Sequence, residues 1–124
     1  MAARTYRELV AWQRAMDFAV EVYRATRQFP REELYGLTSQ VRRAAVSVPS
    51  NIAEGQGRGV GAEFAHHLRI GQNSLEEPET PILLGERPGY LQCADVNALM
   101  DIAGDVGRLT RGLHASVCPN DSSH

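Results

Sequence analysis

Apolar residues recur at steps of three and four along the first part of the chain, which is the spacing of one face of an α-helix. Between residues 6 and 27 this seam consists of Leu9, Trp12, Met16, Ala19 and Tyr23. Arginines and acidic residues occupy the opposite side. The pattern predicts an amphipathic helix whose seam packs in a core, with the two large aromatic residues as core and rim packing.

A second helix is predicted from about residue 30 to residue 54. Phe29 ends the first helix because the residue before a proline resists the α conformation, and Pro30 suits the first turn of the next helix. Pro49 lies inside this stretch and removes a backbone hydrogen bond, so we expect the helix to kink or divide there. The core-facing stripe comprises Leu34, Leu37, Val41, Ala44, Ala45, Val48 and Ile52.

A stripe of polar residues runs beside that apolar stripe, and small apolar residues follow on its other side, at Val46, Ala53 and Gly57. An exposed helix face is usually charged and varied, whereas a polar stripe between apolar residues is typical of a buried, hydrogen-bonded surface. The pattern therefore predicts a second buried face on this helix, turned toward a partner. The polar stripe comprises Gln40, Arg43, Ser47, Asn51, Glu54 and Arg58.

The third predicted helix begins near Ala62 and contains prolines. Its seam runs through Phe64, Leu68, Gly71, Leu75, Pro78 and Ile82. A proline in a helix interior costs about 3 kcal/mol, so we expect this helix to be kinked or broken near Pro78–Pro81. The glycine-rich run before it, from residue 55 to 61, follows a helix and has no lysine. We therefore interpret it as a helix end in the left-handed conformation rather than a phosphate loop.

The fourth predicted helix spans residues 94–117, with Asp95 as its N-cap. Its seam is Leu99, Ile102, Val106, Leu109 and Leu113. With no strand pattern and short connections, the chain is predicted to be all-α, an up-and-down antiparallel four-helix bundle. Residues 6–117 form its single domain, and residues 1–5 and 118–124 are expected to be disordered.

The composition and the net charge of the chain limit the classes of function that it can have. The chain has 124 residues, 43% hydrophobic residues and a formal net charge of −2. A strong nonspecific nucleic-acid binder usually carries a basic surplus, which is absent. No apolar run approaches the ~20 residues that span a bilayer, and the N-terminus lacks the apolar run of a signal peptide. We therefore expect a cytoplasmic protein without a membrane partner.

The candidate chemical groups do not assemble into a catalytic or metal-binding pattern. Cys93 and Cys118 bracket the last helix, and more than ~30 Å separates its ends, so both are expected to be free thiols. His66 and His67 are adjacent and point about 100° apart, so we interpret them as a solvent-facing pair. Glu63 and His67 face each other, but two ligands fall short of a metal site. We expect no enzyme activity, cofactor, metal or small-molecule substrate.

Three segments carry a resemblance to a known family: ELVAWQRAMDFAVEVY, FPREELYGLTSQVRRAAVSVPSNIAEGQGR and EFAHHLRIGQNSLEE. The chain resembles bacterial four-helix-bundle proteins first noticed as reading frames within intervening sequences of 23S ribosomal RNA genes. The resemblance implies a left-handed bundle that assembles into a homopentameric ring, and it implies no catalytic activity. The chain departs from the family pattern at Pro78, Pro81, Gly85 and Pro88, where leucine, glutamine, alanine and leucine are usual.

Two functions from different classes follow. The first is a non-enzymatic assembly or interaction module, in which polar side chains form networks that fix a homo-oligomer. The alternative is an RNA-associated accessory protein that binds through an arginine-bearing face, as in more distantly similar accessory proteins of diversity-generating retroelements. The net charge counts against this second role. The predicted polar network comprises Gln40, Arg42, Arg43, Ser47, Asn51, Glu54, Arg58, Ser74 and Glu77.

Overall fold

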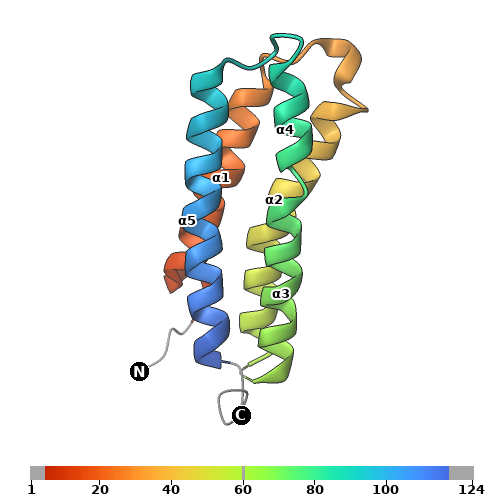
Figure 1. The fold of residues 1–124 in the computed structure, drawn as a ribbon. Helices are drawn as coiled ribbons and strands as arrows, with labels where there is room; N and C mark the ends of the chain where they lie inside the picture. The colour runs from red at the N-terminus through yellow and green to blue at the C-terminus, as the bar shows by residue number, and fades with distance from the viewer. Residues whose placement is uncertain (1–4, 60, 118–124) are drawn as a thin grey trace.

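The computed structural model describes residues 5–59 and 61–117, which form an up-and-down antiparallel bundle of four helical rods (Figure 1). This arrangement confirms the predicted all-α fold. The helix α4 continues in the direction of α3, so the two together make the third rod (Figure 1). The elements are η1 (Tyr6–Glu8), α1 (Val10–Thr26), η2 (Arg31–Glu33), α2 (Leu37–Gly57), α3 (Ala62–Glu76), α4 (Glu79–Glu86) and α5 (Cys93–Val117).

The predicted disordered ends lie outside the described residues, except for Thr5. The Thr5 hydroxyl accepts a hydrogen bond from the backbone N–H of Arg7 at 3.2 Å and so caps η1. Cys118 also lies outside the described residues, whereas Cys93 is a free, exposed thiol. Across the described residues, no helix is long and apolar enough to cross a membrane.

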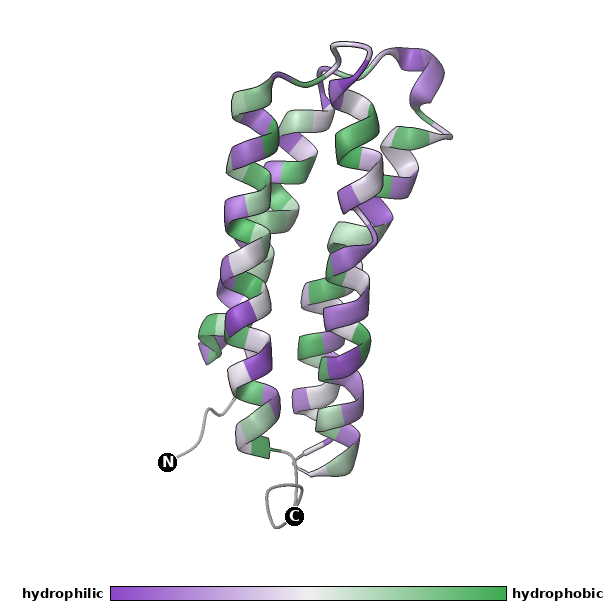
Figure 2. Ribbon diagram, in the orientation of Figure 1, coloured by the Kyte–Doolittle hydropathy of each residue, from purple (hydrophilic) through white to green (hydrophobic). Residues whose placement is uncertain are grey.

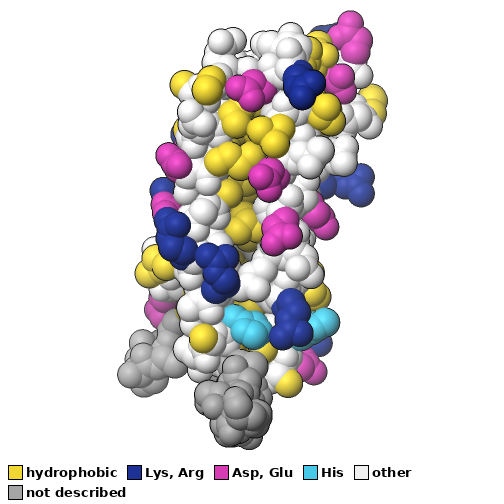
Figure 3. Space-filling view, in the orientation of Figure 1, with side chains coloured by type: hydrophobic (Ala, Val, Ile, Leu, Met, Phe, Trp, Pro, Cys, Tyr) yellow, Lys and Arg dark blue, Asp and Glu magenta, His cyan; other side chains and the backbone are white. Residues whose placement is uncertain are grey.

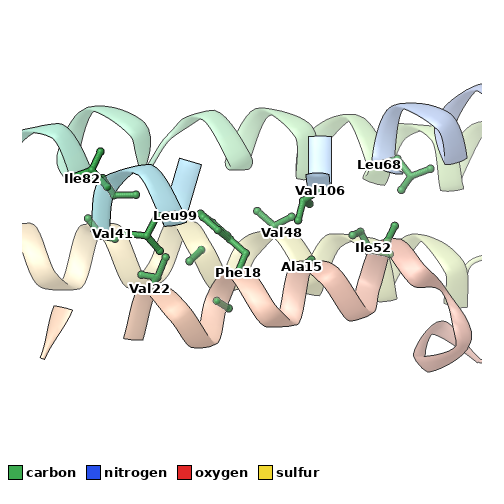
Figure 4. Close-up of a cluster of buried hydrophobic side chains, with 14 of the residues drawn as sticks. Ala15, Phe18, Val22, Val41, Val48, Ile52, Leu68, Ile82, Leu99 and Val106 are labelled. Carbon is green, nitrogen blue, oxygen red and sulfur yellow. The ribbon is translucent and has the colours of Figure 1, made fainter. Parts of the chain in front are cut away.

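All four rods contribute to one apolar core that runs along the bundle axis (Figure 4). Polar and apolar residues alternate around each helix, which is the amphipathic pattern that places one side inside (Figure 2). Phe18 supplies the largest fully buried side chain, and the labelled core runs from Ile82 at one end to Leu68 at the other, with Val106 between them (Figure 4). The seams predicted for the third and fourth helices are therefore inside the bundle.

The predicted seam of α1 was wrong in phase. The buried stripe is Ala11, Ala15, Phe18 and Val22, which lies beside the predicted one. Of the predicted seam, Met16 and Tyr23 are 38% and 43% exposed, Ala19 is buried, and Leu9 and Trp12 are partly buried against the core. The helix carries two neighbouring apolar stripes, and the one with phenylalanine and valine packs inside. The predicted helix start at residue 6 also gives way to η1, because Leu9 is extended.

The second helix starts later than predicted and is not divided. Pro30 precedes the 3-10 turn η2, and α2 begins only at Leu37, so Leu34 lies outside the helix and is 45% exposed. The helix continues through Pro49 to Gly57 as one element. Its other predicted core residues are buried or partly buried against the core. The backbone turns left-handed at Gly59, with φ +99°, as predicted for this glycine-rich run.

The predicted break in the third helix is confirmed, and its position relieves both prolines. The helix α3 ends at Glu76, and Pro78 is the N-cap of α4. The carbonyl of Pro78 accepts the first α4 hydrogen bond, from the N–H of Ile82 at 2.9 Å. Pro81 then occupies the first turn of α4, where a backbone N–H would have no partner within the helix. A new helix start therefore removes the cost of both prolines.

The fourth rod differs from its prediction at its first turn. The helix α5 starts at Cys93, two residues before the predicted cap. Asp95 lies inside the first turn and its carboxylate accepts a hydrogen bond from the N–H of Gln92 at 3.0 Å. This is the returning half of a capping box, because an acidic residue in the first turn reaches back to the N–H before the helix.

Candidate interaction surfaces

The middle of the predicted polar network lies between α2 and α3 of the same chain. The hydroxyl oxygens of Ser47 and Ser74 are 2.8 Å apart. The Asn51 side chain donates to the Ser47 carbonyl at 2.8 Å and to its hydroxyl at 3.1 Å. Asn51 Oδ1 lies 3.3 Å from His67 Nδ1. We call these four residues the α2–α3 polar cluster. Ser74 is only 5% exposed, so the cluster holds two helices of one subunit together.

Glycines allow α2 and α3 to approach closely around this cluster. A Cβ atom at Gly55 would lie 2.8 Å from His67 Cβ and 3.0 Å from Phe64 Cδ1, closer than real Cβ contacts. One at Gly71 would lie 3.6 Å from both Asn51 Cβ and the Val48 carbonyl oxygen. Because the missing side chain at Gly55 is what lets the helices touch there, the sequence positions of small residues set this spacing.

Arg42 turns toward α1 rather than toward the polar cluster. Its Nε donates to Thr26 Oγ1 at 2.8 Å, and its Nη2 donates to the Tyr23 carbonyl at 3.4 Å. The guanidinium carbon lies 4.6 Å from the centroid of the Tyr23 ring. A cation is favourable both at the C-terminal end of a helix and over an aromatic face. Arg42 therefore joins α2 to the end of α1.

Arg58 pairs with acidic residues at the end of α2. Its guanidinium is 2.9 Å from Glu54 and 3.5 Å from Glu63. The hydrogen bond and charge of Glu54, and then those of Glu63, raise the pKa of Arg58 above its ordinary value. All three side chains are exposed, so solvent screens the pairing. Arg58 therefore bridges the last turn of α2 and the first turn of α3.

The remaining predicted residues meet at the opposite end of the bundle. Gln40, Arg43 and Glu77 line one shallow hollow of about 650 Å³ with Tyr35. All four are exposed. No ion pair within 4.0 Å joins Arg43 to Glu77 or to another acid in the described part of the chain. The nine predicted residues thus divide into four separate groups, and this group, like that of Arg58, is open to solvent.

Two residues of these groups were missed by sequence reasoning. His67 was interpreted as solvent-facing, but it is half-buried and contacts Asn51. Only His66 of the predicted pair is exposed. Thr26 was not singled out, although it is the main partner of Arg42. The position of His67, one turn after Phe64 on the seam, was a signal that it faces a neighbouring helix.

A second surface of interest is apolar and lies between α1 and α2 on the outside of the bundle. Its exposed side chains are Met16 (38%), Val20 (42%), Tyr23 (43%) and Val46 (41%). They border a groove of about 560 Å³. We call this surface the α1/α2 face. Its groove is further lined by Tyr6, Trp12, Ala19, Arg24, Arg27, Pro49, Ser50 and Ala53.

The α1/α2 face has a pattern that marks interaction sites. Large apolar side chains scattered singly over a surface are ordinary, whereas contiguous ones rimmed by polar residues are typical of protein contacts. Met16 and Tyr23 belong to the stripe that the sequence analysis assigned to the core. The second apolar stripe of α1 therefore exists, but Met16 and Tyr23 lie on the surface of the subunit and not in its core.

No group of three His, Cys, Asp or Glu side chains in residues 5–59 and 61–117 is placed to hold a metal ion.

A comparison with curated proteins finds no match. The sequence of residues 7–112 matches the protein family described as 23S rRNA-intervening sequence protein. This match covers most of the bundle, from the turn before α1 to near the end of α5. The chain belongs to the 23S rRNA-intervening sequence protein family.

Proposed function

We propose that the chain is a non-enzymatic assembly module that binds copies of itself through the α1/α2 face. The observation that carries the proposal is the exposure of Met16, Val20, Tyr23 and Val46 on two adjacent helices. Fully burying one such side chain contributes about 1.5–3 kcal/mol, and these are already partly covered. Burial of the four together therefore supplies a driving force that a single subunit leaves unused.

A ring of five copies is the arrangement that the family resemblance leads us to propose. The α1/α2 face is bordered by Arg24 and Arg27. This basic border favours contact with a different, acidic surface of the next copy, which is a heterologous contact. Heterologous contacts repeat around a ring when the rotation closes.

The hollow formed by Gln40, Arg43 and Glu77 is a second place where copies of the chain meet in this proposal. Arg43 and Glu77 are exposed and carry opposite charges. A neighbouring copy that supplies an acid to Arg43 and a base to Glu77 gains specificity more than affinity, because rim charges mainly steer association. The α2–α3 polar cluster acts within each subunit and holds this hollow's two helices in place.

Light-scattering mass on a sizing column tests self-assembly. For the wild type we expect a multiple of 13.6 kDa. Val46→Glu adds a charge at an exposed position of the α1/α2 face, so it should reduce the mass toward the monomer while the circular dichroism spectrum stays helical. Val10→Glu is the matched control, because Val10 is 61% exposed and lines neither the α1/α2 face nor the hollow of Gln40, Arg43 and Glu77. A monomeric wild type, or identical masses for all three proteins, contradicts the proposal.

RNA association is the second candidate, and one observation favours it. Arg27, Arg31 and Arg42 line a single hollow where α1 ends and α2 begins. Three guanidinium groups at one end of the bundle offer phosphate contacts despite the net charge of −2. Absorbance at two wavelengths across the sizing peak detects co-eluting nucleic acid. Binding of a labelled RNA that weakens steeply with salt supports this role, and its absence near physiological ionic strength dismisses it.

A further inference from the structure

An open groove runs between the third rod and α5, on the side of the bundle next to the close α2–α3 contact. Its volume is about 530 Å³. The space-filling view shows an apolar floor along it, with acidic side chains on one side and basic side chains on the other (Figure 3). The floor includes Phe18, Leu75, Ile82 and Met100. We call this the α3/α4–α5 groove.

The two walls of the groove carry opposite charges. Glu76 and Glu79 line it from the third rod, and Arg108 and Arg111 line it from α5. Arg108 pairs with Asp105 on its own helix. No ion pair crosses the groove within the described residues, and Glu76, Glu79 and Arg111 pair with no charged group among them. Glu76, Glu79 and Arg111 are therefore available to pair with an occupant, whereas Arg108 would share its guanidinium with Asp105.

Two glycines of α5 shape the basic wall. A Cβ atom at Gly107 would lie 3.1 Å from Arg111 Nη1, and one at Gly104 would lie 3.6 Å from Arg108 Nη1. The guanidinium groups therefore lie back along the helix over the space that side chains at these two positions would take. A Cβ atom at Gly107 would also lie 3.5 Å from Leu75 Cδ2, an ordinary contact, so both cations lie along α5 beside the groove.

The dimensions fit a short helix. The part of α5 that lines the groove, from Met100 to Arg111, extends about 17 Å at 1.5 Å per residue, which corresponds to roughly three helical turns. An amphipathic helix binds such a groove by placing apolar side chains at i, i+3, i+4 and i+7 on the floor. Its flanking positions then face the two walls.

We propose that the α3/α4–α5 groove binds an amphipathic helix of a partner protein, one edge of which is acidic and the other basic. The acidic edge pairs with Arg108 and Arg111, and the basic edge pairs with Glu76 and Glu79. The side-chain amides of Gln72 and Asn73, which also line the groove, supply hydrogen bonds beside the acidic wall. The partner differs from the self-contact proposed above and uses a different face of the bundle.

Three synthetic peptides test this assignment by fluorescence anisotropy. Each has about 18 residues, long enough to be helical in water, and the same leucine stripe. The first has one glutamate edge and one arginine edge, the second has two glutamate edges, and the third has two arginine edges. We expect the wild-type protein to bind the first peptide about tenfold more tightly than the other two, the effect of two or three charge pairs.

A charge reversal on the protein sharpens the test. The double variant Glu76→Arg/Glu79→Arg makes both walls basic, so the peptide with two glutamate edges should become the tightest ligand. The control Glu32→Arg/Glu63→Arg changes the net charge equally at exposed positions outside the groove, and it should keep the wild-type preference. Circular dichroism establishes that both variants remain helical. An unchanged order in the groove variant, the same switch in the control, or no peptide binding to the wild type overturns the proposal.

Discussion

The α2–α3 contact and the contact of the third rod with α5 belong to the same bundle but are built differently. Between α2 and α3, Gly55 lets the helices approach closely, and the α2–α3 polar cluster joins them with hydrogen bonds. Between the third rod and α5, the Cβ positions of Gly104 and Gly107 lie nearest to arginine side chains of α5 itself, and Leu75 of α3 is 3.5 Å from that of Gly107, an ordinary contact distance. Gly55 is therefore required for the close α2–α3 approach, whereas a side chain at Gly104 or Gly107 would meet mainly flexible arginine ends.

The proline break accounts for part of this difference. Because Pro78 starts a new helix, the third rod is interrupted between Glu76 and Glu79, where it lines the groove. Pro78 and Ile82 remain fully buried, so the rod keeps its place in the core. The side that faces α5, however, leaves about 530 Å³ open. We infer that the closed contact serves stability and that the open one is available for binding.

The largest effect is expected from closing the space at Gly55. Gly55→Ala places a methyl group against His67 Cβ and the Phe64 ring, which cannot move without shifting α3. Overpacking of this kind lowers the free energy of unfolding by about 1–3 kcal/mol, measured by urea denaturation. The matched change Gly107→Ala meets the flexible end of Arg111 and should raise it by up to about 1 kcal/mol, because alanine favours the helix. If Gly55→Ala and Gly107→Ala changed the free energy of unfolding equally, the α2–α3 contact would not be more tightly packed than the contact at α5.

The next effect compares two prolines. Pro49 lies inside the continuous helix α2 and leaves the Ala45 carbonyl without its usual donor, so Pro49→Ala should raise the free energy of unfolding by about 1–2 kcal/mol after some loss of packing. Pro81 lies in the first turn of α4, where the restored N–H gains no helical partner. Pro81→Ala should lower the free energy of unfolding by about 1 kcal/mol, because the smaller side chain buries less apolar surface. Strong stabilisation by Pro81→Ala, again by urea denaturation, would show that the break does not relieve the prolines.

A smaller effect is expected in the α2–α3 polar cluster. Ser47→Ala and Ser74→Ala should each lower the free energy of unfolding by about 1 kcal/mol, because each removes a largely buried hydrogen bond. The double variant should cost less than the sum, since both changes remove the same bond. Asn73→Ala on the exposed side of α3 is the control and should change little. Strict additivity in thermal and urea unfolding would indicate that the two serines act independently.

The smallest effect concerns pH and the pairing of α1 with α5. The hydrogen bond from Arg14, at 3.1 Å, lowers the pKa of Asp105 below its ordinary value, and the charges of Arg108 and Arg14 act in the same direction. The stability that the ionised Asp105 contributes to the folded protein is complete above the unfolded-state pKa of about 3.9. It is lost as the pH falls through the lower folded-state pKa. Between pH 5 and pH 2.5 the melting temperature should therefore fall slightly less in Asp105→Asn than in the wild type. If the melting temperatures of the two proteins fell by the same amount over this pH range, the stabilising pair of Arg14 and Asp105 would be contradicted.

Much of the fold was predictable because the signals are local. Leucine and valine spacing identified the cores of α3 and α5, and the cost of two interior prolines predicted the break before α4. The phase of α1 was not predictable in this way. Two adjacent stripes, one with Phe18 and one with Met16, both satisfy the three-four spacing, and only packing against the other rods selects between them.

The candidate surfaces were less predictable because they depend on which helices meet. Ser47 and Asn51 stood out as a polar stripe, but the sequence does not state that α3, rather than another subunit, covers them. Arg42 could not be paired with Thr26, since the two residues lie on different helices and neither belongs to a motif. The α3/α4–α5 groove was absent from the prediction, because a gap between helices depends on the side-chain volumes of all four helices that line it.

Native-state hydrogen exchange, read by mass spectrometry, tests the comparison most directly. Amides are protected according to the free energy of the opening that exposes them. We predict that peptides from α3 exchange only with global unfolding, whereas those from α4 exchange much faster through local opening. Addition of the peptide with one acidic and one basic edge should slow exchange most in α4, because α4 lines the groove with Glu79 and Ile82 and opens locally in the free protein. Equal protection of α3 and α4 in the free protein would contradict the division of the bundle into a closed and an open side.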